Sequence, residues 1–107
     1  MSGFDDREKG FEKKFAHDAD LKFKAESRRN KMLAEWAGAK MGMSEDEITS
    51  YIKDVRRSDL EEAGDDDVFR KVRSDFDAKG TSVTDDELRE QMSTFLAKAV
   101  ADVEAAG

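Results

Sequence analysis

The stretch from residue 75 to residue 88, DFDAKGTSVTDDEL, is where residue types and spacing come closest to metal chemistry. Four residues match positions 1, 3, 6 and 12 of the calcium loop of an EF-hand: Asp75, Asp77, Gly80 and Asp86. Two positions fail, because position 5 is the cation Lys79 and position 12 lacks the longer, bidentate Glu. Calcium takes roughly six to eight oxygen ligands, so we expect no metal site here.

Acid–base and nucleophilic chemistry has few residues to use. The chain has one His, His17, and no Cys. A single His excludes a His-rich zinc site and the paired Glu-x-x-His motifs of a ferritin-like carboxylate site. The sequence has no Ser/His/Asp set and no phosphate-binding glycine loop. We interpret His17 as a solvated side chain or, alternatively, a pH-sensitive contact, and we expect neither enzyme activity nor a cofactor.

The elements that carry these residues are expected to be helices. The chain has 107 residues, no Pro and 42% charged residues, and its runs of Ala, Glu, Lys, Asp and Leu favour helix over sheet. We therefore expect a single all-α domain. No apolar run approaches the roughly 20 residues of a membrane span, and no apolar signal segment follows the N-terminus. A soluble, cytoplasmic protein without membrane insertion is the expectation.

The charge of the chain is acidic and unevenly distributed. The formal net charge is −7. Residues 1–43 carry ten Lys or Arg against eight Asp or Glu, a net of +2, whereas residues 44–107 carry nine against eighteen, a net of −9. Nonspecific nucleic-acid binding needs a basic face that releases phosphate counterions. We therefore expect no nucleic-acid partner, and we interpret the acidic total as solubility.

Glycine stops and polar starts divide the chain into four helices joined by short loops. The core half of the first helix is predicted at about residues 20–40. Glycines, which favour the left-handed conformation of a helix end, close the first three helices: Gly42, Gly64 and Gly80. Capping boxes open the second and fourth helices: Ser44 with Glu47, and Thr84 with Glu87. The acidic triplet 65–67 is interpreted as the cap of the third, so the pattern predicts a small four-helix domain.

Each predicted helix carries one apolar face at helical spacing. The residues expected in the core are Leu21, Ala25, Met32, Leu33, Trp36, Ile48, Tyr51, Ile52, Val55, Val68, Phe69, Val72, Phe76, Leu88, Met92, Phe95, Leu96, Ala99 and Val103. Arg29 falls on the same face of the first helix, between Ala25 and Leu33. A cation in that position either reaches solvent or meets a carboxylate. We expect an acidic partner from the later, negative part of the chain, with the triplet 65–67 as the candidate.

A second apolar stripe lies ahead of this domain. Phe4, Phe11 and Phe15 fall within an arc of roughly 40° when the segment is drawn as a helix. A first helix over residues 5–40 would be about 54 Å long, whereas helices of about 18, 14 and 20 residues span roughly 21–30 Å. The stripe therefore overhangs the other helices. Either the segment folds back onto the bundle, or it is disordered alone and becomes a helix in a partner's groove.

The stretch FDDREKGFEKKFAHDADLKFKAESRRNKMLAEWA resembles the zeta subunit family, small alphaproteobacterial proteins that inhibit the ATPase of the F-type ATP synthase. The pattern FDDRE, then FE-x-KFAHD, then FK-x-x-x-RRNK-x-L-x-x-W, is met at Phe4 to Glu8, Phe11 to Asp18, and Phe23 to Trp36. A second block, E-E-A-G-D-x-D-V-F-R-K-V, is met at Glu61 to Val72. The resemblance covers most of the chain and thins after about residue 77.

The resemblance implies a four-helix fold, residues 20–107, preceded by a mobile inhibitory segment, residues 1–19. In the family this segment becomes helical at a catalytic interface of the soluble sector, between the nucleotide-binding subunits and the rotor stalk. It implies apolar anchors at Phe4, Phe11 and Phe15. It implies polar contacts with the cleft walls at five further residues: Asp5, Asp6, Arg7, Glu8 and Lys14. Gly10 lies inside this segment and would cost a helix about 1 kcal/mol relative to Ala.

The location and assembly follow from the same resemblance. It implies a protein of the bacterial cytoplasm, held at the cytoplasmic face of the inner membrane through the synthase and monomeric when free. Two alternatives remain open. One is a four-helix adaptor whose tail folds back on its own bundle, with little or no inhibitory activity. The other is a ligand-binding bundle in which Arg29 and the acidic turn line a polar site.

Overall fold

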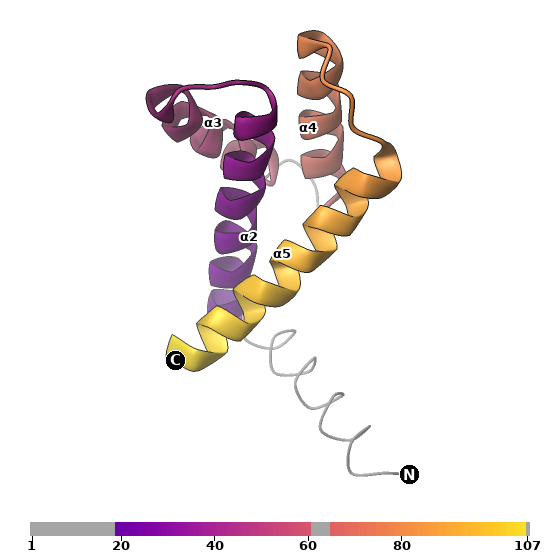
Figure 1. Cartoon of the computed structure of the whole chain (residues 1–107). Helices are drawn as coiled ribbons and strands as arrows, with labels where there is room; N and C mark the ends of the chain where they lie inside the picture. Colours follow the sequence, from indigo (N-terminus) through magenta and orange to yellow (C-terminus); the bar gives the residue numbers. More distant parts are fainter. Residues whose placement is uncertain (1–18, 61–64, 107) are drawn as a thin grey trace.

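The computed structural model describes residues 19–60 and 65–106. These residues form four α-helices and no strand, so the predicted all-α class with short loops is confirmed. The helices are α2 (Ala19–Lys40), α3 (Glu45–Ser58), α4 (Asp66–Lys79) and α5 (Asp85–Ala106) (Figure 1). Within the described part, none of these helices is apolar over enough length to cross a membrane.

The predicted helix starts are confirmed at both capping boxes. The Ser44 hydroxyl accepts a hydrogen bond from the Glu47 amide at 3.2 Å, and the Glu47 carboxylate accepts one from the Ser44 amide at 3.0 Å. The hydrogen bond from the Ser44 amide is the main cause that lowers the pKa of Glu47, because it stabilises the ionised carboxylate. At α5, the Thr84 hydroxyl accepts from the Glu87 amide at 3.1 Å. Side-chain oxygens thus satisfy amides that the first turn of a helix leaves free.

Two of the predicted glycine stops are observed. Gly80 caps α4 with φ of 67° and ψ of 28°, the left-handed conformation. Gly42 follows α2 with φ of 76°. The third, Gly64, lies outside the described residues.

The end of α3 differs from the prediction. The helix was expected to span about 18 residues toward Gly64, but it has 14 residues and ends at Ser58. The Ser58 hydroxyl donates to the Val55 carbonyl at 2.7 Å, and the amide of the C-cap residue, Asp59, donates to the Val55 and Arg57 carbonyls. These bonds satisfy the last carbonyls of the helix without a glycine. The side chain of Asp59 can then contact Asn30 and Arg29 of α2.

The start of α4 also differs from a simple cap. Asp65 occupies the N-cap position, as the triplet 65–67 predicted, but its side chain makes no capping hydrogen bond. Its carboxylate lies 3.8 Å from Arg29 Nη1 and 3.5 Å from Arg89 Nη1. Asp66 pairs with Arg89 at 2.9 Å. The triplet therefore ties the start of α4 to α2 and to α5, besides placing negative charge at a helix N-terminus.

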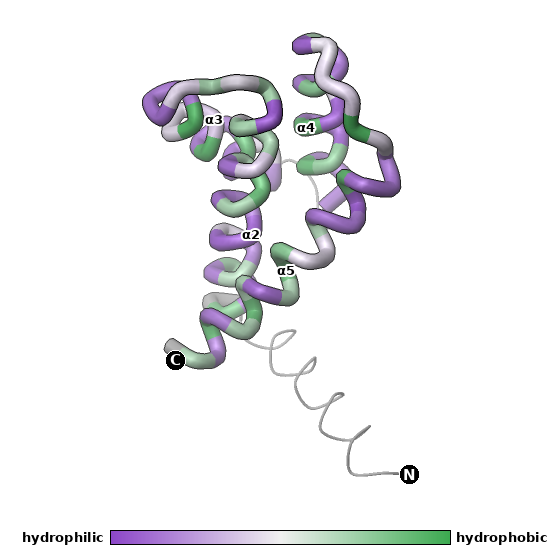
Figure 2. Tube along the Cα trace, in the orientation of Figure 1, coloured by the Kyte–Doolittle hydropathy of each residue, from purple (hydrophilic) through white to green (hydrophobic). Residues whose placement is uncertain are grey.

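Helix α2 contacts each of the other three helices. In Figure 1, α5 runs back across α2, so that the end of α5 lies near the start of α2. Figure 2 shows apolar and polar positions recurring along each helix, as amphipathic helices require. The core cluster consists of Leu33, Ala34, Ala37, Tyr51, Val55, Val68, Val72, Phe76, Val83, Leu88 and Met92. Most of it was predicted; the small residues Ala34 and Ala37, and Val83 in the α4–α5 loop, were not.

An aromatic contact joins three helices at the centre. The ring of Trp36 on α2 meets Phe76 on α4 edge to face, with centroids 5.7 Å apart. It also meets Phe95 on α5 at 6.5 Å. Edge-to-face pairs of this kind add about 0.5–1.5 kcal/mol to the burial of the rings. Trp36 is therefore the side chain that fixes α2 against α4 and α5.

Candidate functional site

The site predicted from the sequence lies outside the described residues. It comprises Phe4, Asp5, Asp6, Arg7, Glu8, Phe11, Lys14 and Phe15. His17 and Gly10 lie outside them as well. The structure instead describes the domain that follows this segment, in which two surfaces and one buried polar cluster stand out.

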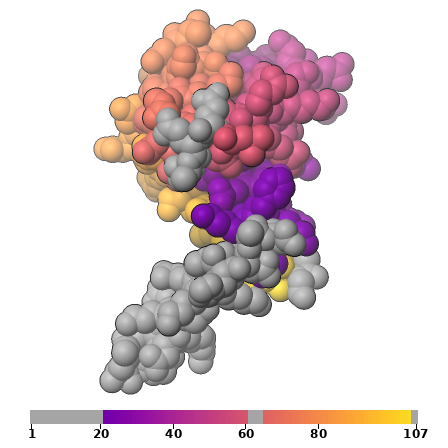
Figure 3. Space-filling model, turned by 180° about the vertical axis from the view of Figure 1, so that it is seen from behind, coloured from indigo at the N-terminus to yellow at the C-terminus, as the bar shows by residue number. Residues whose placement is uncertain are grey.

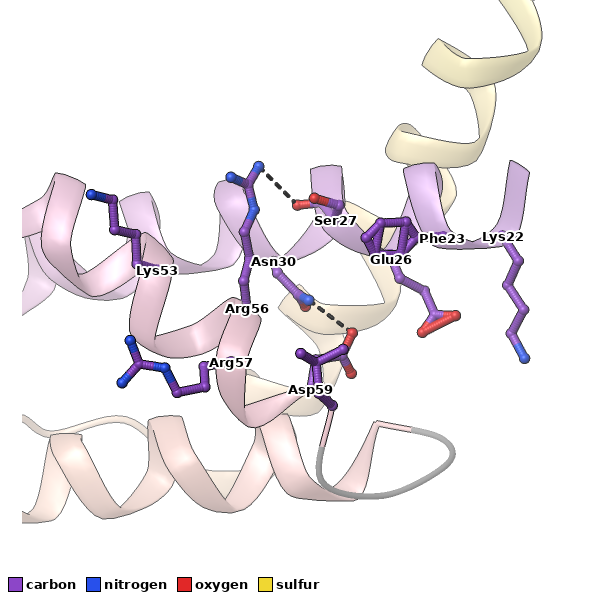
Figure 4. A pocket seen from close by; sticks show the side chains of 10 residues that line it. Lys22, Phe23, Glu26, Ser27, Asn30, Lys53, Arg56, Arg57 and Asp59 are labelled. Carbon is purple, nitrogen blue, oxygen red and sulfur yellow. Dashed lines mark hydrogen bonds between the residues drawn. The ribbon is translucent and has the colours of Figure 1, made fainter. Parts of the chain in front are cut away.

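The buried polar cluster centres on Arg29, which is 1% exposed. Its Nη2 atom lies 3.6 Å from Asp59 Oδ1, and its Nε atom donates to Asn30 Oδ1 at 2.6 Å. Asn30 Nδ2 in turn donates to Asp59 Oδ2 at 2.9 Å (Figure 4). Together with the contact to Asp65, these distances confirm that Arg29 meets acidic partners from the later part of the chain.

This arrangement holds both ends of the α3–α4 connection. Asp59 follows the last residue of α3, and Asp65 precedes the first residue of α4. At 3.6 Å, Arg29 Nη2 and Asp59 Oδ1 are too far apart for a hydrogen bond, and neither buried atom has another such partner among the described residues. The attraction is therefore one between charges. A buried cation without these carboxylates would be costly.

Two carboxyl groups beside this cluster are pushed toward protonation. Burial raises the pKa of Asp59, with the carboxylates of Asp67 and Asp65 adding to it, against the hydrogen bond from Asn30 and the charge of Arg29. Burial likewise raises the pKa of Glu26, and the negative charge of Asp59 adds to it. Both effects disfavour the ionised form.

A groove opens between the start of α2 and the end of α3, with a volume of about 560 Å³. We call it the α2–α3 groove. Its lining residues are Lys22, Phe23, Glu26, Ser27, Asn30, Lys53, Arg56, Arg57, Asp59 and Leu60. In Figure 4, Asn30 and Asp59 meet between the two helices, with Lys22 and Glu26 to one side and Lys53 and Arg57 to the other. Seen from behind in Figure 3, the end of α3 and the start of α2 lie next to each other on one face.

The groove combines exposed apolar side chains with cations. Phe23 is 62% exposed and Leu60 is 77% exposed; among the described residues they are the large hydrophobic side chains left in solvent. Four cations line the same groove: Lys22, Lys53, Arg56 and Arg57. Arg56 Nη2 donates a long hydrogen bond, 3.4 Å, to the Ser27 carbonyl of α2 (Figure 4). The sequence did not predict this surface. The feature that could have indicated it is Phe23, which lies outside the apolar face of its helix.

A second surface lies on α5. A shallow hollow of about 710 Å³ is lined by Ser93, Leu96, Ala97, Val100, Ala101 and Glu104. These residues recur at the spacing of one helix face. Ala97 and Ala101 are exposed, while Leu96 and Val100 are half-buried. This strip lies on the outside of the helix, away from its buried residues Leu88, Met92, Ala99 and Val103.

The EF-hand-like stretch carries carboxylates that are already paired. Asp75 accepts a hydrogen bond from the Tyr51 hydroxyl at 2.8 Å and pairs with Lys71 at 3.0 Å. Asp77 pairs with Arg73 at 3.0 Å. Burial, together with the hydrogen bond to Asp75, raises the pKa of Tyr51. Throughout the ranges that the structure describes, no group of three or more His, Cys, Asp or Glu side chains is placed to hold a metal ion.

Comparisons with known proteins agree with the fold and with the motifs. The sequence pattern of the family described as ATPase inhibitor subunit zeta matches residues 1–102. A protein solved in solution by NMR shares 38% sequence identity with this chain, over 81% of this chain and 99% of that one, with a TM-score of 0.70. No curated protein matches. The family match spans nearly the full sequence and confirms the resemblance carried by the FDDRE and RRNK motifs: the chain belongs to the ATPase inhibitor subunit zeta family.

Proposed function

We propose that this protein is a non-enzymatic regulator that restrains ATP hydrolysis by the F-type ATP synthase. The observation that carries the proposal is the family match over residues 1–102, which takes in both the aromatic segment and the helical domain. An inhibitor of a rotary ATPase needs no catalytic groups of its own. It needs a body that binds the enzyme and a part that obstructs it.

Residues 1–19 are the obstructing part in this proposal. The segment enters a catalytic interface of the soluble sector as a helix, between the nucleotide-binding subunits and the rotor stalk. Phe4, Phe11 and Phe15 share a narrow arc of that helix and act as its apolar anchors. The flanking polar residues, Asp5, Asp6, Arg7, Glu8 and Lys14, contact the walls of the interface.

The helical domain positions this segment. Helix α2 begins at Ala19, so any force on an inserted segment passes directly into a helix that contacts the other three. Ala25, Arg29, Leu33 and Ala37 of α2 are buried against the bundle, and Trp36 locks it against α4 and α5. These contacts hold the middle and the end of α2 in the bundle. The domain would act at the cytoplasmic face of the membrane through the enzyme, as a monomer when free.

The test measures ATP hydrolysis by the purified cognate soluble sector. The full chain is compared with a chain lacking residues 1–19 and with a full-length Phe11→Ser/Phe15→Ser variant. We expect inhibition by the full chain and its loss in both variants, with the helical content of each unchanged by circular dichroism. Equal inhibition by the full and the shortened chains would refute the role of the segment.

The strip on α5 supports a second candidate, the adaptor with a folded-back tail. Its exposed alanines and half-buried Leu96 and Val100 would accept a phenylalanine stripe, and the end of α5 lies near the start of α2 (Figure 1). Amide hydrogen exchange on the free protein separates the two candidates. Strong protection at Phe11 and Phe15 supports the folded-back tail, and rapid exchange there supports the inserting segment.

A further inference from the structure

We propose that the α2–α3 groove is a second attachment site, which binds an acidic protein segment that carries a large apolar side chain between its carboxylates. The inference rests on the proposed function for one point only, that this segment belongs to the soluble sector of the synthase. The chemistry of the occupant follows from the groove itself.

The apolar character comes from two side chains. Phe23 from α2 and Leu60 from the turn after α3 are the large hydrophobic residues that the described chain leaves exposed, at 62% and 77%. Both line the same groove. Single exposed hydrophobic residues are ordinary on a surface, whereas apolar side chains gathered at one hollow are typical of contact sites. An apolar side chain of the partner would remove both from water.

The charge of the groove selects an acidic partner. Four cations line it, in a chain whose formal net charge is −7. Two of them, Arg56 and Arg57, are neighbours in the last turn of α3. The guanidinium group forms paired hydrogen bonds with a carboxylate and desolvates more readily than an ammonium group. Against these four stand Glu26 and Asp59, and Asp59 is already engaged by Asn30 and Arg29.

The position of the two acidic residues distinguishes a protein segment from a small anion. Glu26 and Asp59 line the groove together with Asn30, and burial already raises the pKa of both carboxyl groups. A compact anion seated beside them would meet two carboxylates. Carboxylates carried on a peptide chain can instead reach the outer cations, while an apolar side chain fills the space beside Phe23 and Leu60. The groove therefore fits a chain with separated charges.

The groove also lies close in sequence to the end of the proposed inhibitory segment. Lys22 and Phe23 lie in the first turns of α2, directly after residues 1–19. A partner seated here would hold the domain while the segment enters its interface. Two linked contacts bind more tightly than either alone, because the second forms within the complex. Inhibition would then depend on the groove as well as on the phenylalanines.

The chemistry of the occupant is tested without the synthase. Isotope-labelled full-length protein is titrated by NMR with three probes: a synthetic glutamate-rich peptide with one leucine per helical turn, an all-glutamate peptide, and inorganic phosphate. We expect saturable shifts at Phe23, Ser27, Arg57 and Leu60 with the leucine-containing peptide, and weaker shifts with the all-glutamate peptide. Equal or stronger binding of phosphate at these amides would overturn the proposal in favour of a small-anion site, and no shifts with any probe would overturn it outright.

The role in the assembly is tested with full-length variants. Arg56→Glu/Arg57→Glu reverses two groove cations, and Phe23→Ser/Leu60→Ser removes the apolar pair. We expect each to weaken binding to the cognate soluble sector by about tenfold, and we expect charge reversal to reduce the salt dependence of binding as well. Wild-type affinity in both variants contradicts the inference.

The matched control reverses two exposed cations outside the groove, Arg28→Glu/Lys98→Glu, with the same change in net charge. The control should bind with wild-type affinity. An equal loss of affinity in the control would show that the change in net charge, and not the groove, causes the effect. Binding and inhibition are read separately. A groove variant that loses binding supports the groove even if deletion of residues 1–19 leaves inhibition unchanged. The two proposals can therefore fail independently.

Discussion

Arg29 is the most buried charged side chain among the described residues. It faces carboxylates from both sides of the α3–α4 connection. The sequence predicted an acidic partner, because Arg29 falls on the apolar face of a helix in a chain with a negative second half. It did not predict Asp59, since a helix expected to continue toward Gly64 leaves residue 59 inside a regular turn. The end of α3 carries a hydrogen bond from the Ser58 hydroxyl to the Val55 carbonyl, a local stop that a search for glycine does not find.

Replacing Arg29 with Met should therefore destabilise the fold strongly. Met preserves much of the buried volume but leaves the carboxylates of Asp59 and Asp65 without their cation, a loss of about 3 kcal/mol in the free energy of unfolding. Chemical denaturation at neutral pH measures it. The loss should shrink in acid, where the protonated carboxyl groups need no cation. A loss that is independent of pH would assign the effect to packing instead of charge.

Glu26→Gln should increase the free energy of unfolding, whereas Arg29→Met decreases it. Because burial and Asp59 raise the pKa of Glu26 above its ordinary value of 4.5, the folded state favours the protonated form, despite the attraction of Lys22 and Arg29. The stability that this group contributes is present below its ordinary pKa and is lost as pH rises through the raised value. The Gln variant should thus be more stable than the wild type at neutral pH, by less than about 1 kcal/mol because solvent screens the site. Thermal unfolding at neutral and acidic pH should show this gain only at neutral pH.

At the scale of elements, local sequence signals predicted starts better than ends. Ser44 and Thr84 cap helices as their motifs require, because a capping box is satisfied within four residues. Gly80 ends α4 for an equally local reason, its left-handed backbone. Asp65 holds the N-cap position and pairs with Arg29, as expected of the triplet, but its side chain makes no capping hydrogen bond. The α2–α3 groove could not be predicted from local patterns, because α2 and α3 come together only in the folded chain.

Gly80→Ala tests the backbone requirement in isolation. A Cβ atom added at Gly80 would contact nothing within 4 Å, yet φ is 67°. The substitution should therefore destabilise the protein by about 1–2 kcal/mol through backbone conformation alone. Gly80→Asn, which tolerates the left-handed region better, should recover part of this loss. If urea denaturation gave the Ala variant wild-type stability, the turn would have to adopt another conformation.

At the scale of the whole molecule, the proposed function divides the work of an inhibitor between two parts of the chain. In the described helical domain, Trp36, Phe76 and Phe95 pack against one another, whereas Phe23 stays exposed. The aromatic residues of the leading segment have no place in the core that the sequence predicted. Helix lengths predicted that the phenylalanine stripe overhangs the three shorter helices, and they left open whether the segment folds back onto the bundle or enters a partner's groove. The identity of the partner is not a property of composition, and it came from the motifs.

Gly10→Ala tests whether residues 1–19 act as a helix on the enzyme. Glycine in a helix interior costs about 1 kcal/mol relative to alanine, and a segment that folds on binding meets that cost each time it binds. If the segment inserts as a helix, the Ala variant should inhibit hydrolysis at roughly fivefold lower concentration, while Gly10→Pro should abolish inhibition because proline breaks a helix at that position. The half-inhibitory concentration measures both, and helical content by circular dichroism confirms that the domain is unchanged. Should Ala and Pro variants inhibit alike, the segment would bind in an extended form, and the phenylalanines would have to act without the common arc that a helix gives them.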